Sequence, residues 1–298
     1  MIEMKQKMLV TGASGMLGGT LVRYFSPVFE VYASSGQSEL PYAEKHLTFD
    51  LNRNDYEVLL EWAQPDIIIH SAALTNGNLC DRNPEIALKT NALSLNKIAL
   101  GAKPETRIIH ISTDAVFSSR AHNSNENDFA GSDSVYGKSK ELGEFFLQLR
   151  SQNFTIIRTT IVGVNQLEGR QGFAEWIVKS AREKERIGLF DDVFFTPICC
   201  STLARIIFKI LQNGYFINEK VHIGASEIYS KYNFGISLLK ELGLGTDQIE
   251  KSKITNFSGR AKRATDQSLN SSYFEKVTGI TLPGLIETVK QLKKDFDE

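Results

Sequence analysis

The amino-acid sequence predicts an α/β fold in which helices cover both faces of a doubly wound, parallel sheet. Short runs rich in β-branched residues alternate with segments of helical period, as expected for parallel strands joined by crossover helices. At 67–69 and 108–109, isoleucines fill consecutive positions, which is typical of strands buried on both faces. A glycine-rich segment follows the first run and opens a helix. An open sheet of this kind binds ligands at the carboxyl ends of its strands.

The β-rich runs define six expected strands, at 7–11, 30–33, 46–50, 66–70, 107–112 and 154–158. Beyond the sixth strand the alternation weakens, then returns as a strand and a helix near 187–211. The remainder of the chain is mostly of helical period. We therefore expect a sheet domain at 1–165 and 187–224, with a smaller, mostly helical substrate lobe at 166–186 and 225–298.

The composition is that of a globular protein, with 298 residues, 42% apolar content and 23% charge. Lysine and arginine number 34 against 35 acids and form no long basic stripe, so we expect no nucleic-acid partner. The segment 1–7 runs directly into a strand, which argues against a signal peptide, and no apolar run has membrane-spanning length. The chain has three cysteines, an odd number, and two of them are adjacent, which fits neither a disulfide framework nor a metal site with spaced ligands: Cys80, Cys199 and Cys200. These features predict a cytoplasmic protein without membrane association or a bound metal.

The glycine-rich segment predicts a dinucleotide-binding loop in a Rossmann-type sheet. Gly12 and Gly15 would let the backbone turn tightly beside a pyrophosphate, whose charge the amides of the following helix would meet. Gly18 would let that helix pack closely on the strand. Two residues, rather than the usual one, separate the first two glycines, yet the strand before and the helix after support the interpretation. The same loop brings three further residues to the expected cofactor site: Ser14, Met16 and Leu17.

The ends of the next strands would complete the cofactor site. An acid at the end of strand two normally binds the ribose of NAD and repels a 2′-phosphate. Ser34 and Ser35 stand there instead, which favours NADP(H) over NAD(H), although a plain serine turn is an equally open alternative. Asp50 fits either an adenine contact or a helix N-cap. The remaining expected contacts follow strands three and four: Leu51, Ser71, Ala72 and Ala73.

A tyrosine and a lysine four residues apart, preceded by a threonine at a strand end, predict the catalytic site. Tyr136 and Lys140 would share one face of a helix. A phenol has an ordinary pKa of about 10, and the ammonium of Lys140 is expected to stabilise its phenolate. Hydride transfer to a ketone leaves an alkoxide, to which Tyr136 would give a proton while Thr113 holds the oxygen by a hydrogen bond.

These motifs together resemble the extended short-chain dehydrogenase/reductase superfamily, in particular its dTDP-4-dehydrorhamnose reductase branch. The resemblance covers nearly the full chain and is carried by TGASGMLG from residue 11, HSAALTNGNLCDRNPEIALKTNALS from residue 70, HISTDAVF from residue 110 and SVYGKSKELGE from residue 134. It implies NAD(P)H-dependent reduction of the 4-keto group of a nucleotide-linked deoxysugar, in the synthesis of surface-polysaccharide precursors. The implied partner is a nucleotide-sugar substrate, and a homodimer is left open.

The resemblance also implies roles for single residues. Thr113, Tyr136 and Lys140 take the catalytic positions, and the last two also contact the cofactor. Asp114 orients substrate or proton, and Asn91 falls on a cofactor position of the active-site helix.

The substrate side matches the family less well than the cofactor side. Phe173 and Arg263 fall on substrate-binding positions, together with Thr113 and Asp114. However, Arg263 is followed by alanine where relatives often have proline, and the asparagine usual before Phe173 is replaced by Gly172. The identity of the sugar therefore stays open.

Three alternatives remain at the level of the sequence. A sugar-nucleotide dehydratase on the same fold typically has Asp-Glu after the threonine, and Ala115 after Asp114 argues against it. An epimerase needs only reversible hydride transfer, so these residues do not exclude it. A non-catalytic subunit, similar to the regulatory beta subunit of methionine adenosyltransferase, is disfavoured because Thr113, Tyr136 and Lys140 are all present.

Overall fold

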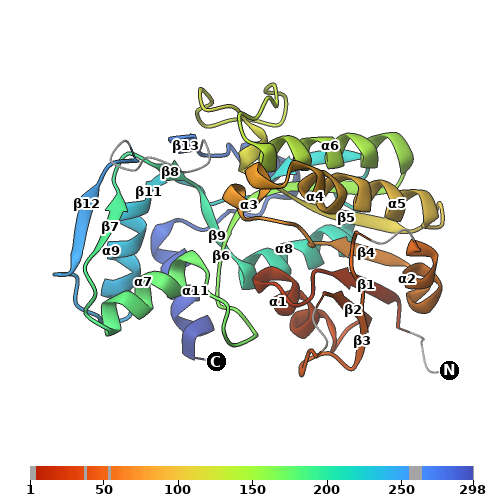
Figure 1. Cartoon of the computed structure of the whole chain (residues 1–298), viewed down its shortest axis with the longest axis horizontal. Coiled ribbons are helices and arrows are strands. Elements are labelled where there is room, and N and C mark those ends of the chain that lie inside the picture. The colour runs from red at the N-terminus through yellow and green to blue at the C-terminus, as the bar shows by residue number, and fades with distance from the viewer. Residues whose placement is uncertain (1–4, 37–38, 53–54, 255–263, 298) are drawn as a thin grey trace.

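The fold is built on one large parallel sheet. A computed structural model describes residues 5–36, 39–52, 55–254 and 264–297. Figure 1 shows the sheet and its helices on one side and a smaller lobe on the other. The strand order is β10-β6-β5-β4-β1-β2-β3, and β9 pairs with the end of β6. The strands are β1 (Lys7–Thr11), β2 (Glu30–Ser35), β3 (Lys45–Thr48), β4 (Ile67–His70), β5 (Arg107–Thr113), β6 (Phe154–Val162), β9 (Pro197–Cys199) and β10 (Glu219–His222).

Helices cover both faces of this sheet, which confirms the predicted doubly wound fold. One face packs on a core that includes Leu21 and Ile207, and the other on a core that includes Leu59 and Leu147. The helices of this part are α1 (Met16–Phe25), α2 (Tyr56–Ala63), α3 (Gly77–Arg82), α4 (Pro84–Leu88), α5 (Ser94–Gly101), α6 (Val135–Arg150), α8 (Cys200–Asn213) and α10 (Ser272–Thr278).

The consecutive isoleucines divide between these two cores. Ile67 and Ile69 of β4 belong to the core with α1 and α8, whereas Ile68 belongs to the core with α2 and α5. Successive side chains of a strand point to opposite faces, so a strand with apolar layers on both sides requires an apolar residue at every position. The same alternation separates Ile108 from Ile109 in β5.

The predicted strands all form, and several extend further than expected. β2 continues to Ser35, because Ser34 pairs with Thr11 of β1 and Ser35 pairs with Thr48 of β3. The alternative of a plain serine turn is therefore wrong. β5 likewise includes Thr113, which places this hydroxyl at the carboxyl edge of the sheet.

The smaller lobe packs three helices around an apolar core that includes Ile177, Phe234 and Leu292. Two small sheets, ordered β11-β8-β13 and β12-β7, accompany these helices. The lobe contains α7 (Phe173–Arg182), β7 (Ile187–Phe190), β8 (Phe194–Phe195), β11 (Tyr229–Ser230), α9 (Lys231–Glu241), β12 (Ile249–Ser252), β13 (Asp266–Gln267) and α11 (Leu285–Asp297). The division of the chain into two domains at the expected boundaries stays a prediction. Among the described residues, no helix combines the length and the apolar character needed to span a bilayer.

Candidate active site

The glycine loop between β1 and α1 has the backbone that a dinucleotide cofactor requires. Gly12 has a φ of +71°, in the left-handed region that favours glycine, and its carbonyl accepts a 2.9 Å hydrogen bond from the Gly15 amide. A Cβ atom on Gly18 would lie 2.1 Å from the Gly12 carbonyl oxygen, so helix α1 packs on the loop at a distance that only glycine allows. The loop therefore fits a pyrophosphate at the amino end of α1.

The side chains of the other predicted residues of this loop pack inward. Leu17 is buried in the core, and Met16 packs against the same core. Ser14 is also buried. Any contact of these three residues with the cofactor would therefore be made by their backbone atoms, and it stays a prediction.

Serines and one histidine line the end of β2. Ser34 and Ser35 are buried, and the Ser35 hydroxyl lies 3.1 Å from Nε2 of His46 on β3. No acid stands at this strand end. The preference for NADP(H) that the serines favour stays a prediction.

The expected contacts after β3 and β4 lie at the same sheet edge. Asp50 accepts a hydrogen bond from the Asn52 amide at 2.9 Å, whereas α2 has Asp55 as its N-cap residue, so Asp50 does not cap that helix. The Ser71 hydroxyl donates to the Thr11 carbonyl at 2.7 Å, which ties β4 to β1. The remaining expected residues of this edge are Leu51, Ala72 and Ala73, of which Ala72 is buried.

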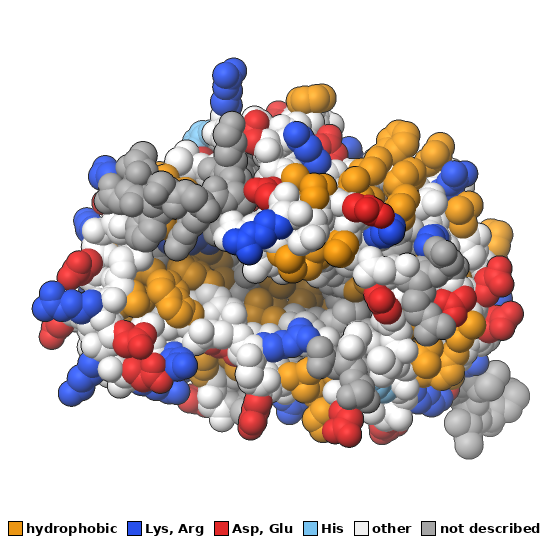
Figure 2. Space-filling view, viewed as in Figure 1, with side chains coloured by type: hydrophobic (Ala, Val, Ile, Leu, Met, Phe, Trp, Pro, Cys, Tyr) orange, Lys and Arg blue, Asp and Glu red, His pale blue; other side chains and the backbone are white. Residues whose placement is uncertain are grey.

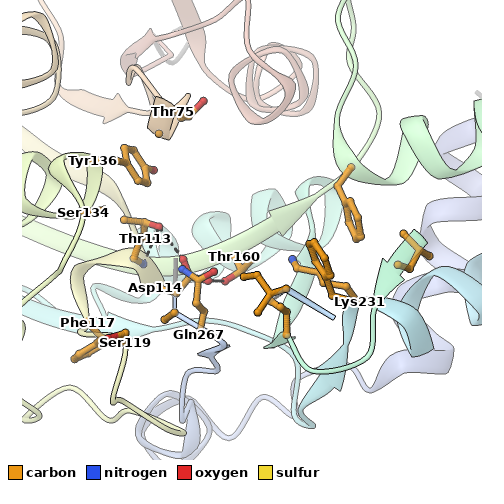
Figure 3. Close-up of a pocket in the computed structure, with 18 of the residues that line it drawn as sticks. Thr75, Thr113, Asp114, Phe117, Ser119, Ser134, Tyr136, Thr160, Lys231 and Gln267 are labelled. Carbon is orange, nitrogen blue, oxygen red and sulfur yellow. Dashed lines mark hydrogen bonds between the residues drawn. The ribbon is translucent and has the colours of Figure 1, made fainter. Parts of the chain in front are cut away.

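The first turn of α6 brings Tyr136 to the end of β5. Ser134 caps the helix by accepting a 3.0 Å hydrogen bond from the Gly137 amide. A Cβ atom on Gly137 would lie 2.0 Å from the Ala115 carbonyl, so the helix packs directly on the turn that follows Thr113. Burial raises the pKa of Tyr136, and its hydrogen bond with the Thr113 hydroxyl acts in the opposite direction. Figure 3 shows Tyr136 and Thr113 on the same wall.

Asp114 connects two hydroxyl groups beneath this site. Its carboxylate accepts a 2.8 Å hydrogen bond from Thr113 Oγ1 and a second, short one from the hydroxyl of Thr160 on β6 (Figure 3). Burial raises the pKa of Asp114, while the two hydroxyls and the charge of Lys231 lower it. Asp114 therefore fixes the direction in which the Thr113 hydroxyl points.

Lys140 is buried deeper than the sequence suggests. Its Nζ atom donates to the Ile111 carbonyl at 2.7 Å and lies 3.2 Å from Nε2 of His110, which stacks on His70. Burial lowers the pKa of Lys140 to about 7. We expected this ammonium to lower the pKa of Tyr136, but burial outweighs any such effect, because the phenol pKa is raised.

Asn91 lies beside α6 rather than on it. It belongs to a π-helical turn, Lys89–Leu93, between α4 and α5. Its Nδ2 atom donates to the Ser139 hydroxyl at 2.9 Å and to the Leu74 carbonyl at 3.1 Å, and its Oδ1 atom accepts from the Leu74 amide. Asn91 thus fastens the segment after β4 to α6, and a direct cofactor contact stays a prediction.

A cavity of about 780 Å³ opens between the sheet edge and the lobe. Thr113, Asp114 and Tyr136 line its sheet side, and Phe173 lines its lobe side, so the structure brings these predicted residues together. Figure 2 shows a hollow in this face with apolar side chains in its depth. Arg263, the remaining predicted substrate residue, lies outside the described residues.

Several residues of the cavity escaped the sequence reasoning. Trp176 follows Phe173 by three positions, so its place on the same face of α7 was readable from the helical period. Thr75 lies inside the motif that begins at residue 70, but no role at the site was predicted for it from the sequence. The other lining residues that were not predicted include Thr160, Lys231 and Gln267.

Comparison with known proteins settles the family. Residues 6–297 match the family model described as the RmlD substrate binding domain. The chain belongs to this family. The expected resemblance to the dTDP-4-dehydrorhamnose reductase branch of the extended short-chain dehydrogenases is thereby confirmed.

Similar proteins include enzymes of sugar-nucleotide metabolism. The spore coat polysaccharide biosynthesis protein SpsK of Bacillus subtilis is 30% identical, over 80% of this chain and 81% of that protein. The dTDP-4-dehydrorhamnose reductase of Escherichia coli is 26% identical, over 97% of each chain. The structure of dTDP-4-dehydrorhamnose reductase from Bacillus anthracis in complex with NADP superposes with a TM-score of 0.86 at 20% identity, over 97% of this chain and 99% of that one. The last comparison shows that the fold is shared.

Proposed function

We propose that this protein reduces the 4-keto group of a nucleotide-linked deoxysugar with NAD(P)H. The observation that carries the proposal is the pairing of Tyr136 with Thr113 on the wall of a cavity large enough for a nucleotide sugar. The family supports it, since its relatives include proteins named dTDP-4-dehydrorhamnose reductase and dTDP-4-keto-6-deoxy-D-glucose reductase.

The cofactor would be held by the glycine loop and by the ends of β2, β3 and β4. When bound, a reduced nicotinamide supplies the hydride for the keto carbon. Gly12, Gly15 and Gly18 shape the backbone that receives the pyrophosphate. Because Ser34 stands where an acid would repel a 2′-phosphate, we propose that the protein prefers NADPH to NADH.

Tyr136 would act as the proton donor. A phenol with its ordinary pKa of about 10 is protonated at neutral pH, and burial raises the pKa of Tyr136 further, so the side chain holds the proton that an alkoxide needs. Thr113 would hold the substrate oxygen beside it. Because Thr113 Oγ1 donates its one proton to Asp114, this proton must turn away from Asp114 when the hydroxyl donates to the substrate. Tyr136 therefore delivers the proton, and Thr113 with Asp114 positions the oxygen.

Lys140 would act from beneath the site. Its buried Nζ atom donates to the Ile111 carbonyl of β5, which ties the amine to the strand that ends at Thr113. From this place we propose that it holds the ribose hydroxyls next to the nicotinamide, while its pKa of about 7 lets it shed or take a proton near neutral pH.

The direct test is oxidation of NADPH and NADH, followed by absorbance, with a panel of 4-keto-6-deoxy sugar nucleotides. We expect turnover with at least one of them and a lower KM for NADPH than for NADH. A nucleotide sugar without a ketone should give no oxidation. If the protein binds dinucleotide but oxidises none across the panel, the reductase proposal fails and a regulatory role in a protein complex takes its place.

A further inference from the structure

A buried histidine contacts Lys140, and the proposed function gives this histidine no role. The Nε2 atom of His110 lies 3.2 Å from Lys140 Nζ, which also donates to the Ile111 carbonyl at 2.7 Å. Both side chains are buried, with exposed fractions of 0% for His110 and 2% for Lys140. His110 belongs to β5 and Lys140 to α6. The contact therefore joins the strand that ends at Thr113 to the helix that carries Tyr136.

The groups around Lys140 give its charge little support. Burial lowers the pKa of Lys140, and the charge of Glu144, one turn further along α6, acts in the opposite direction. Glu144 is itself paired with Arg158 of β6 at 2.6 Å. On β4, burial and the charge of Lys140 lower the pKa of His70 to about 3, so this ring stays neutral. A buried ammonium needs hydrogen-bond acceptors to remain charged, so the imidazole of His110 and the backbone carbonyl beside it carry particular weight.

The charge of Lys140 determines which nitrogen of His110 holds the ring proton. Burial, the charge of Lys140 and His70 lower the pKa of His110 well below its ordinary value, whereas a contact with the His70 backbone acts in the opposite direction. A neutral imidazole has one N–H group and one acceptor nitrogen, and an ammonium can only donate. Nε2 can therefore accept from Lys140 only if the proton is on Nδ1. That atom is buried and makes no hydrogen bond of regular geometry within the described part of the chain.

The neighbouring histidine fixes the ring plane of His110. His70 pairs with His110 in the register of β4 and β5, and the two rings stack with centroids 5.5 Å apart and an interplanar angle of 27°. Nδ1 of His70 lies 2.8 Å from the hydroxyl of Thr11, the last residue of β1 before the glycine loop. The ring that faces Lys140 is thus held by a neighbour that is itself tied to the next strand of the sheet.

We propose that His110 is a positioning residue for Lys140, whose ammonium donates a hydrogen bond to Nε2 and is thereby held charged and in place. The inference rests on the proposed function for what Lys140 does during reduction, whereas the hydrogen bond itself is independent of the substrate. His110 and the Ile111 carbonyl engage two of the three N–H groups of the ammonium. The third is left for the ribose hydroxyls that the proposed function assigns to Lys140.

His110 has one competing role, which is to fill space between the sheet and α6. The two roles change different quantities. Loss of packing lowers the free energy of unfolding and leaves the pKa of Lys140 where it was. Loss of an acceptor lowers the pKa of Lys140, because a hydrogen bond to the charged form of a group favours that form.

The test is an NMR titration of the full chain with 13C-labelled lysine, in which the Lys140 signal is the one that Lys140→Met removes. His110→Gln and His110→Asn form a matched pair, because the glutamine amide reaches as far as Nε2 and the asparagine amide only as far as Nδ1. His110→Asn should lower the pKa of Lys140 by roughly one to two pH units, as expected for one hydrogen bond to a charged group. His110→Gln should keep the pKa close to that of the wild type.

The control is the same substitution at another buried histidine. His222 lies on β10, and its Nδ1 atom is 2.9 Å from the Ser124 carbonyl. His222→Gln should leave the pKa of Lys140 unchanged. A second measurement needs no variant to fold: in the 15N spectrum of the wild-type histidine rings, His110 should be neutral with its proton on Nδ1.

A proton on Nε2 of His110 would overturn the proposal whatever the variants show, because the imidazole would then donate to the amine. An equal pKa of Lys140 in the wild type and His110→Asn would also overturn it. So would an equal fall in His110→Asn and His110→Gln, since the ring rather than an acceptor would then be responsible. If the predicted pattern appears but no 4-keto sugar nucleotide is reduced, the proposed function fails and the role of His110 stands.

Discussion

The two walls of the cavity are built by different physical means. On the sheet side, Thr113 ends β5, Asp114 follows it in a short turn, and Tyr136 lies in α6. Hydrogen bonds and close backbone packing at Gly137 fix these residues. On the lobe side, Phe173 stacks on Trp176 and Phe234 with ring centroids 6.2 and 5.9 Å apart. Hydrogen bonds specify direction, whereas ring packing tolerates adjustment.

This difference suggests a division of labour. Under the proposed function, the sheet wall would have to hold a proton donor to within a fraction of an ångström, because proton transfer fails when the geometry is loose. The lobe wall would have only to accommodate and orient the rest of the substrate. Substitutions on the sheet wall should therefore act on kcat, and those on the lobe wall should act on the KM of the nucleotide sugar.

The largest effect is expected for Tyr136→Phe on the sheet wall. The ring remains and only the proton source is removed, so kcat should fall by roughly 100- to 10,000-fold. The NADPH dissociation constant, measured by fluorescence titration, should change little. As a control, Tyr273→Phe removes a phenol that donates to Glu219 outside the cavity, and it should leave both quantities unchanged. Full activity in Tyr136→Phe would show that another group donates the proton.

A smaller effect is expected for Phe173→Leu on the lobe wall. Loss of the stacked ring should raise the KM of the nucleotide sugar by roughly 10-fold, with kcat and NADPH affinity close to those of the wild type. Steady-state kinetics with saturating NADPH measures both constants. Phe208→Leu, in the core beside α1, is the control for loss of an aromatic ring away from the cavity. If Phe173→Leu lowered kcat and left the KM of the nucleotide sugar unchanged, the proposed difference between the two walls would be wrong.

The pH dependence of stability tests the burial of Lys140. Its pKa falls from 10.5 to about 7 on folding, so between these values the unfolded chain binds the additional proton and stability rises with pH. The free energy of unfolding should rise by up to about 1.4 kcal/mol per pH unit within this range, and this dependence on pH disappears below pH 7. His110 and His70 face the amine, but burial lowers their pKa values below this range.

Urea unfolding of the wild type and Lys140→Met at pH 7 and pH 9, without added dinucleotide, measures this contribution. The free energy of unfolding of the wild type, relative to that of Lys140→Met, should be greater at pH 9 than at pH 7. The same difference between the two proteins at both pH values would show that the lysine stays charged in the folded protein.

The sheet half of the molecule was predictable because its rules are local. Consecutive isoleucines indicate strands with two buried faces, and glycines between a strand and a helix indicate a tight loop, so β1, β4 and β5 needed no knowledge of distant residues. Helical spacing puts Tyr136 and Lys140 on one face, but their catalytic interpretation also needed Thr113 at a strand end and the glycine loop. Helical spacing does not show how deeply a side chain is buried, and the structure buries Lys140 with its Nζ atom against His110 and the Ile111 carbonyl.

The lobe wall was less predictable because it is assembled from distant segments. Lys231 reaches the cavity because α9 begins beside Phe195 of β8 and Phe173 of α7. No motif in the sequence marks this contact between distant segments. Thr160 similarly acquires its role from the register of β6 beside β5, which brings it to Asp114. Such contacts depend on tertiary packing, which overrides local signals.

Mass spectrometry of the nucleotide sugar after incubation with NADPH tests the central claim most directly, because it separates reduction from epimerisation. We expect a product heavier than the 4-keto substrate by one hydride and one proton, formed in equal amount to the NADPH consumed. A product of unchanged mass, formed without net consumption of NADPH, would contradict the reductase assignment and identify an epimerase built on the same site.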